Sequence, residues 1–252
     1  IQSLLMQSYA DYDVFIIDDH SQDDSFNVVS EFEAQNFNVL RAREGTVGKS
    51  ACLNELTKTL SINYDVLAFT DADCVLDKDW IGNMVKHLEV NDLVADETLV
   101  VGDSFLQVFE KIEYREIFGI VRFMGTLSVL PSMMGNNFAI KHSLFQSIGG
   151  YEDITNSIVE DVDLLRLVNA ADAKTLMLSD CKVRTNVDSD WSDLVKQRLR
   201  RSKGVHFSTG YVLLGLIFVI FKLAPYILLL TDPIFGLALC ALRWSMIFCF
   251  TP

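Results

Sequence analysis

The stretch Asp65-Val66-Leu67-Ala68-Phe69-Thr70-Asp71-Ala72-Asp73 decides the fold class of this chain. A short apolar run between polar residues is typical of a strand that is buried on both faces of a parallel sheet. Two aspartates follow at the carboxyl end of that strand. Ligands of open α/β sheets bind outside the carboxyl ends of the strands. We therefore expect Asp71 and Asp73 to lie at a binding site.

A second segment of the same design lies upstream. Val14-Phe15-Ile16-Ile17 is apolar and ends in Asp18-Asp19. Residues 37–40 predict a further strand, and helical patterns alternate with these strands over residues 24–35, 49–60, 79–89, 105–123 and 160–170. This alternation predicts an α/β domain with a Rossmann-like, mostly parallel sheet. Asp18-Asp19 and the Asp71 and Asp73 pair then both fall at the carboxyl ends of strands.

The charge of the chain is divided unevenly. The 252 residues have a formal net charge of −13, yet residues 209–252 contain only Lys222, Asp232 and Arg243 as charged residues. The first 208 residues are therefore strongly acidic. An acidic domain argues against nucleic-acid binding, which requires positive charge opposite phosphate.

The cysteines do not indicate a zinc site. No two of them form a CxxC pair, and they are Cys52, Cys74, Cys181, Cys240 and Cys249. We interpret them as reduced thiols that face the cytosol or are buried in packing.

The C-terminal tail, residues 209–252, predicts a transmembrane hairpin. Residues 211–230 are interrupted only by Lys222 and Pro225, and residues 233–250 only by Arg243. About 20 apolar residues span a bilayer. A pair of buried helices in a soluble core is the alternative interpretation.

A basic segment, residues 196–208, precedes this tail. It opens with Lys196-Gln197-Arg198-Leu199-Arg200-Arg201-Ser202-Lys203, which contains no acidic residue. Positive charge beside a membrane span remains on the cytoplasmic side and attracts anionic lipid. We therefore expect a domain over residues 1–195 in the cytoplasm, at the inner (plasma) membrane.

Two acidic pairs carry the predicted chemistry. Asp71 and Asp73 are suited to a hard divalent cation, Mg²⁺ or Mn²⁺, which in turn holds a diphosphate. Glu160-Asp161 could supply a general base that removes a proton from an acceptor hydroxyl. Each pair has an ordinary alternative: a solvated turn for the first, and acidic residues at a helix start for the second.

In order along the chain, seven segments together resemble the family 2 glycosyltransferases of the GT-A fold. They are Leu5-Met6-Gln7-Ser8-Tyr9, Ile16-Ile17-Asp18-Asp19-His20-Ser21-Gln22-Asp23, Gly48-Lys49-Ser50-Ala51-Cys52-Leu53-Asn54, Asp71-Ala72-Asp73, Gly135-Asn136-Asn137, Gly149-Gly150-Tyr151 and Val159-Glu160-Asp161-Val162-Asp163-Leu164.

The resemblance implies an inverting transfer of a sugar from a nucleotide-sugar donor, a UDP-sugar above all, to a glycan or lipid-linked acceptor. It implies that Asp161 is the catalytic base. The donor nucleotide would contact Asp18, Asp19, Lys49 and Asp71, and the metal would bind Asp73 and Asp71. The acceptor would contact Asn137, Glu160, Gln197 and Arg200.

Two departures from the family stand out. The family begins with a strand and a Pro-Thr-Tyr-Asn-like loop, whereas this sequence begins with a helical pattern at Ile1, so we expect an upstream strand. Processive members carry Gln-x-x-Arg-Trp near the membrane. Here Gln197 and Arg200 fit this pattern, but Arg201 replaces the tryptophan. Membrane-surface charge is the alternative role for Gln197 and Arg200.

Two other functions remain open from the sequence. A non-catalytic, membrane-tethered nucleotide- or sugar-binding module would be expected to lack Asp73 or Asp161, and both are present. A nucleotidyltransferase would share the α/β architecture and the acidic metal ligands. It would normally show a glycine-rich basic phosphate loop near its start, and none is visible.

Overall fold

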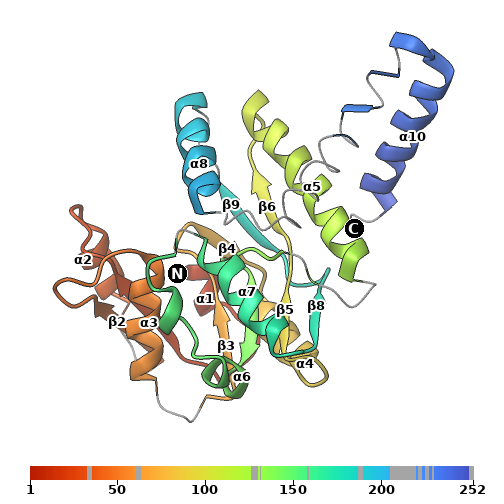
Figure 1. The fold of residues 1–252 in the computed structure, drawn as a ribbon. Helices are drawn as coiled ribbons and strands as arrows, with labels where there is room; N and C mark the ends of the chain where they lie inside the picture. Colours follow the sequence, from red (N-terminus) through yellow and green to blue (C-terminus); the bar gives the residue numbers. More distant parts are fainter. Residues whose placement is uncertain are drawn as a thin grey trace.

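The computed structural model shows a layered α/β domain. Two helices, α8 (Trp191–Gly204) and α10 (Pro233–Cys249), stand away from its sheets (Figure 1). The description covers residues 1–32, 36–60, 64–125, 130, 132–157, 159–186, 190–204, 220, 223–224, 227–228 and 230–249.

The strands form three sheets in the described part of the chain. In the first sheet, β1 (Val14–Asp18) pairs with β2 (Phe37–Arg41). The second has the order β3 (Val66–Phe69), β7 (Phe138–Lys141), β5 (Leu93–Ala95) and β8 (Thr175–Met177). The third has the order β4 (Cys74–Leu76), β9 (Val183–Asn186) and β6 (Thr98–Val101).

The predicted mostly parallel sheet is wrong, because the two larger sheets are mixed. The pairs β1–β2, β5–β8 and β6–β9 are parallel, whereas β3–β7, β5–β7 and β4–β9 are antiparallel. β7 causes most of the difference, since it lies between β3 and β5 and runs against both. The sequence patterns predicted β1, β2 and β3, but neither the other strands nor the direction in which β7 returns.

The helices follow the predicted pattern closely. The predicted segments correspond to α2 (Ser25–Ser30), α3 (Lys49–Thr59), α4 (Trp80–Leu88), α5 (Phe105–Gly125) and α7 (Glu160–Ala170), of which α2 is shorter and α5 slightly longer than predicted. The remaining helices are α1 (Gln2–Leu5), α6 (His142–Ser147), the short η1 (Glu152–Ile154), α8 (Trp191–Gly204) and α10 (Pro233–Cys249).

The core consists of two apolar clusters on the two faces of the β3-β7-β5-β8 sheet. Side chains alternate between the faces of a strand. In β7, Phe138 and Ile140 therefore join one cluster, and Ala139 joins the other. Phe138 also stacks on Phe69 of β3, with ring centroids 4.6 Å apart. Because Phe69 lies at the end of β3, this packing fixes the backbone from which Asp71 and Asp73 follow.

A buried polar junction joins the sheets to α4. The indole nitrogen of Trp80 donates to the side-chain oxygen of Asn137 at 2.8 Å. The amide nitrogen of Asn137 donates to the carbonyl oxygens of Glu97, at 2.9 Å, and Cys181, at 3.0 Å. One side chain therefore connects four segments inside the core, where a polar group without a partner is costly.

The C-terminal part of the chain is described only in places. Residues 205–219, and with them most of the first predicted span, lie outside the described residues. The second predicted span corresponds to α10, which packs against α5. Within the part that the structure describes, no helix combines the length and the apolar character that a membrane crossing requires.

Replacing Asn137 by alanine should lower the free energy of unfolding by about 3 kcal/mol, because three buried polar groups lose their partner. Urea denaturation of the variant and the unchanged chain measures the difference. Asn83→Ala is the control, since the Asn83 side chain donates one exposed hydrogen bond, to the Asp180 carbonyl oxygen. Equal losses in the two variants would contradict a structural role for Asn137.

Candidate functional site

The candidate site lies where β1 and β3 end and where α3 and α7 begin. Asp18 and Asp19 come at the end of β1, Lys49 is the first residue of α3, and Asp71 follows β3. Glu160 and Asp161 open α7, which begins about ninety residues after Asp71 in the chain. The hydrogen bonds and ion pairs described next connect these segments into one cluster.

On the β1 side, the two aspartates have different partners. The Asp19 carboxylate accepts a hydrogen bond from the Gly48 amide at 2.9 Å, and Gly48 has a φ of 93°, a left-handed conformation that favours glycine. The buried Asp18 carboxylate pairs with Arg41 at 3.3 Å and accepts from the Ser21 amide. Asp19 thus fixes the loop that precedes α3, whereas Asp18 holds the ends of β1 and β2 together.

Lys49 connects the Asp71–Asp73 pair to the Glu160–Asp161 pair. Its ammonium nitrogen lies 2.7 Å from Asp71 Oδ1 and 2.9 Å from Glu160 Oε1. Burial alone would lower the pKa of Lys49, but the neighbouring Asp71 and Glu160 charges outweigh it and raise the pKa. Lys49 is therefore held as a cation between the end of β3 and the start of α7.

Asp71 and Asp73 lie in different surroundings. Burial raises the pKa of Asp71, and the Asp73 and Glu160 charges act in the same direction, while Lys49 opposes them. The Asp73 carboxylate accepts from the Thr185 hydroxyl at 3.2 Å and from the Cys74 thiol at 3.4 Å. Thr185 lies on β9, and no local signal in the sequence indicated its role.

Asp161 is held by two backbone amides, from Gly135 at 3.0 Å and from Val162 at 2.8 Å. Burial, followed by the adjacent Glu160 charge, raises the pKa of Asp161. A Cβ atom on Gly135 would lie 3.1 Å from Asp161 Cβ and 3.2 Å from Glu160 Oε1. Only a glycine allows the backbone to come this close to both carboxylates without displacing them.

The structure does not bring the four predicted acceptor residues together at one place. Glu160 is part of the cluster through Lys49. Asn137 is fully buried, and both hydrogens of its amide group are used inside the core. It therefore has no free donor for an acceptor sugar, and we leave it out of the proposed site. Gln197 and Arg200 lie on α8, and their side chains are outside the described part of the structure.

A divalent cation fits the chemistry of Asp71 and Asp73. Both are carboxylates, which Mg²⁺ and Mn²⁺ prefer, and the raised pKa of Asp71 reflects in part the negative charge of Asp73. A cation between them would relieve that repulsion. The ligands would be Asp73 and Asp71, as the sequence predicts.

A second group of possible metal ligands, Asp96, Asp180 and Cys181, has unsuitable partners. Asp96 pairs with Arg122 at 3.1 Å and accepts from the backbone amide of Cys181 at 2.7 Å. Burial raises the pKa of the Cys181 thiol far above its usual range, so the thiolate that binds metal is disfavoured. This group is better explained as a buried ion pair.

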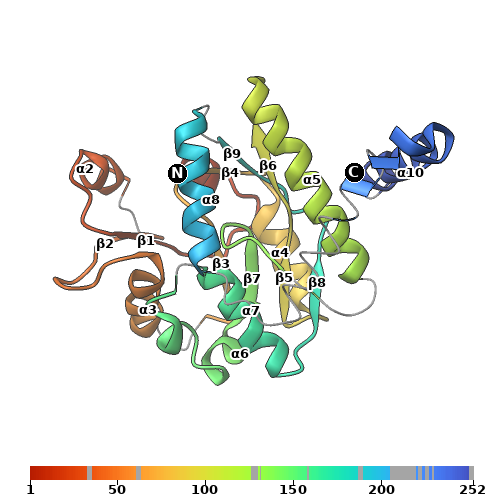
Figure 2. The same ribbon diagram turned by 45° about the horizontal axis from the view of Figure 1, so that its top comes forward.

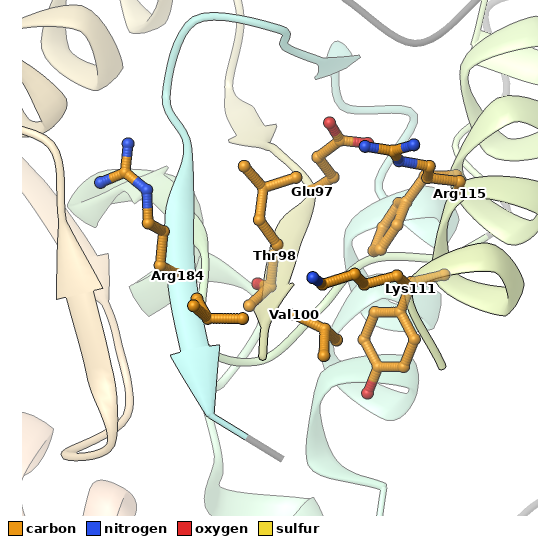
Figure 3. A pocket seen from close by; sticks show the side chains of 10 residues that line it. Glu97, Thr98, Val100, Lys111, Arg115 and Arg184 are labelled. Carbon is orange, nitrogen blue, oxygen red and sulfur yellow. The ribbon is translucent and has the colours of Figure 1, made fainter. Parts of the chain in front are cut away.

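A cavity of about 280 Å³ lies between α5 and the strands β6 and β9 (Figure 3). The four carboxylates Asp71, Asp73, Glu160 and Asp161 do not line it. Two of its cations already have partners, because Lys111 donates to the Gly102 carbonyl and Arg184 pairs with Asp77 at 2.7 Å. The cavity is therefore separate from the carboxylate cluster.

Comparison with known proteins finds related sequences and folds. The chain is 25% identical over 211 residues to a poly-beta-1,6-N-acetyl-D-glucosamine synthase of Staphylococcus epidermidis, which covers 82% of this chain and 50% of that protein. It is 23% identical over 167 residues to the enzyme of the same name from Staphylococcus aureus strain COL, with coverages of 64% and 40%. The chain thus spans about half the length, or less, of these relatives.

Two solved structures share the fold. The mannosyltransferase PcManGT from Pyrobaculum calidifontis, in complex with GDP-Man and Mn²⁺, has a TM-score of 0.59 and 18% identity, covering 81% of this chain and 56% of that one. S. aureus TarS 1-349 has a TM-score of 0.52 and 16% identity, with coverages of 73% and 55%. These similarities show the GT-A fold, with mixed sheets.

The family model of glycosyl transferase family 2 matches residues 1–149, more than half of the chain. The matched region includes the carboxyl ends of β1 and β3 with their aspartates, the Lys49 loop and the Gly135 turn. The chain therefore belongs to glycosyl transferase family 2.

Proposed function

We propose that this chain is the catalytic part of an inverting glycosyltransferase, which transfers a sugar from a UDP-sugar donor to a glycan or lipid-linked acceptor. One observation carries the proposal. Lys49 joins Asp71, on the predicted donor side, to Glu160, which is adjacent to the predicted base Asp161. The residues for holding a diphosphate and for removing a proton are therefore neighbours.

The donor side is formed by Asp19, Lys49, Asp71 and Asp73. Asp19 contacts the nucleoside, and the Lys49 ammonium contacts the diphosphate. Asp73 and Asp71 would hold Mg²⁺ or Mn²⁺, which when bound neutralises the negative charge of the departing diphosphate. A nucleotide-sugar donor is supported by the names of the relatives and by the GDP-Man and Mn²⁺ bound to the mannosyltransferase.

Asp161 is the base in this mechanism. The acceptor oxygen attacks the anomeric carbon from the face opposite the diphosphate, and the bond from that carbon to the diphosphate oxygen breaks. The proton of the acceptor hydroxyl passes to Asp161, and the nucleoside diphosphate leaves with the bonding electrons. A raised pKa suits a base, because it brings the proton affinity of Asp161 closer to that required near neutral pH.

A purely binding module would not need this environment. Burying a carboxylate next to a second one is unfavourable, and the structure maintains Asp161 beside Glu160 with two amide hydrogen bonds. Such arrangements of titratable groups are concentrated at catalytic sites. The family membership also favours sugar transfer over nucleotidyl transfer.

Replacing Asp161 by asparagine should reduce turnover by about 10²–10⁴-fold and leave donor affinity nearly unchanged, because asparagine retains the size of the side chain but does not accept the proton. Product formation by the full-length protein and calorimetric donor binding measure the two effects. Asp163→Asn is the control, since Asp163 lies on the same helix but bonds Ser157 and Arg166. Normal turnover in Asp161→Asn would exclude it as the base.

The acid limb of kcat/KM should lie above pH 3.8, the ordinary pKa of an aspartate, because the raised pKa of Asp161 means that the base is protonated at a higher pH. Glu160→Gln removes a charge that raises this pKa, so the limb should move to lower pH. Transfer rates measured across the pH range test the sign. A limb that stays in place or moves to higher pH would contradict the assignment.

We also propose that the protein acts at the cytoplasmic face of the plasma membrane, where Gln197, Arg200 and Glu160 contact the acceptor. Five of the eight residues 196–203 are basic, and the apolar tail follows them.

Exposed apolar side chains recur every four residues along α8, at Trp191, Val195 and Leu199. In Figure 2, which brings the top of Figure 1 forward, α8 lies in front of the sheets, and Arg198 joins it to α5 through Glu113. Basic residues beside exposed aromatic and aliphatic residues suit an anionic lipid surface.

A chain that ends at residue 208 should no longer require detergent for extraction but should still bind vesicles that contain anionic lipid. Trp191→Ser in this shorter chain should weaken the vesicle binding, because it removes apolar surface from α8. Val90→Ser is the control, since Val90 is also apolar and is 72% exposed but follows α4. Flotation with anionic and neutral vesicles measures both effects. Detergent dependence of the folded shorter chain would contradict a role for the tail.

A further inference from the structure

Lys49 lies between the two acidic pairs of the proposed site. Its ammonium lies 2.7 Å from Asp71 Oδ1, which we propose as a metal ligand, and 2.9 Å from Glu160 Oε1. The Lys49 side chain as a whole is 39% exposed, so it lies at the edge of the site and is not enclosed by the core. A positive charge of the chain itself is thus already in contact with one member of each acidic pair, Asp71 and Glu160.

We infer that Lys49 is a resident counterion of the site, which neutralises Asp71 and Glu160 while the donor is absent and is transferred to the diphosphate when donor and cation arrive together. This inference rests on the proposed function. The inference adds a binding order to the proposed function. The divalent cation alone binds weakly, and the cation and the diphosphate bind cooperatively.

Competition for Asp71 is the physical reason. Oxygen ligands lie about 2.0–2.1 Å from Mg²⁺, so a cation bound to Asp71 would be close to the ammonium, and two positive charges at that separation repel each other. The conflict ends when the diphosphate arrives, because its oxygens accept the ammonium. Lysine suits such a transfer, because a compact charge is carried on a flexible four-carbon stem.

The backbone of Lys49 is held while its ammonium can move. Gly48 is anchored by the Asp19 carboxylate, and Lys49 begins α3, whose Cys52 amide bonds back to the Gly48 carbonyl at 3.0 Å. The ammonium could therefore leave Asp71 without unfolding the loop. Because Asp19 is also the proposed nucleoside contact, the anchor of this loop lies at the other end of the donor site.

The test measures Mn²⁺ binding by calorimetry on the full chain without any sugar donor, and then with UDP or GDP present. Lys49→Gln should bind Mn²⁺ alone about tenfold more tightly than the unchanged chain, because the competing charge is gone. Added nucleotide should strengthen Mn²⁺ binding less than in the unchanged chain, because the phosphate partner is also gone. Mn²⁺ should raise the thermal midpoint more in Lys49→Gln.

Two matched variants separate charge from packing. Lys49→Arg keeps a positive charge at the same position and should retain the weak Mn²⁺ binding. Lys58→Gln breaks an exposed ion pair on the same helix, to Glu152 at 2.8 Å, and should leave Mn²⁺ binding unchanged. Asp73→Ala should weaken Mn²⁺ binding, because it removes a proposed ligand.

The failures of the inference and of the proposed metal site are distinguishable. If Asp73→Ala weakens Mn²⁺ binding but Lys49→Gln binds Mn²⁺ like the unchanged chain, the counterion role is overturned and the metal site stands. A full nucleotide effect in Lys49→Gln would also overturn it. If Asp73→Ala leaves Mn²⁺ binding unchanged, the metal site itself is wrong, and the counterion role is overturned with it.

Discussion

The ion pairs of Lys49 with Asp71 and Glu160 are the interaction on which the site depends. Four carboxylates come together where β1, β3 and α7 meet α3, inside a domain that is already strongly acidic. Without a cation, their mutual repulsion would oppose the approach of α7 to the end of β3. Lys49 supplies that cation, and its raised pKa shows that the two carboxylates outweigh the cost of its burial. The same contact brings the proposed donor and base residues together.

Packing in the core holds the residues of these contacts in position. Phe69 is fixed by stacking on Phe138 and so positions the start of the Asp71 segment. Asn137, a few residues after the Gly135 turn that holds Asp161, is tied to Trp80 in the core. Both ends of the site are therefore attached to the same buried strand, β7. A site whose groups must hold their positions within fractions of an ångström benefits from such a rigid support.

The Asp71–Asp73 pair and the Glu160–Asp161 pair have different surroundings. Asp73 receives hydrogen bonds from the Thr185 hydroxyl and the Cys74 thiol and remains available as a ligand. Asp161 is buried beside Glu160, and its pKa is raised. Asp161 is thus held by backbone amides beside a second carboxylate, whereas Asp73 is held by two neutral side-chain donors. The proposed mechanism assigns the base to Asp161 and the cation to Asp73.

The sequence by itself determined the parts of the site that depend on local pattern. The apolar runs before Asp19 and Asp71 identified strands and placed the aspartates at their ends, and the acidic opening of α7 indicated a helix start at Glu160. Only the tertiary structure decided that β7 runs antiparallel, that Lys49 bridges two segments and that Asn137 serves the core. Periodicity along one segment reports which residues are buried, because burial repeats with the geometry of that segment. It contains no information about partners more than a hundred residues away, such as Thr185 for Asp73, because these are set by strand pairing across the whole domain.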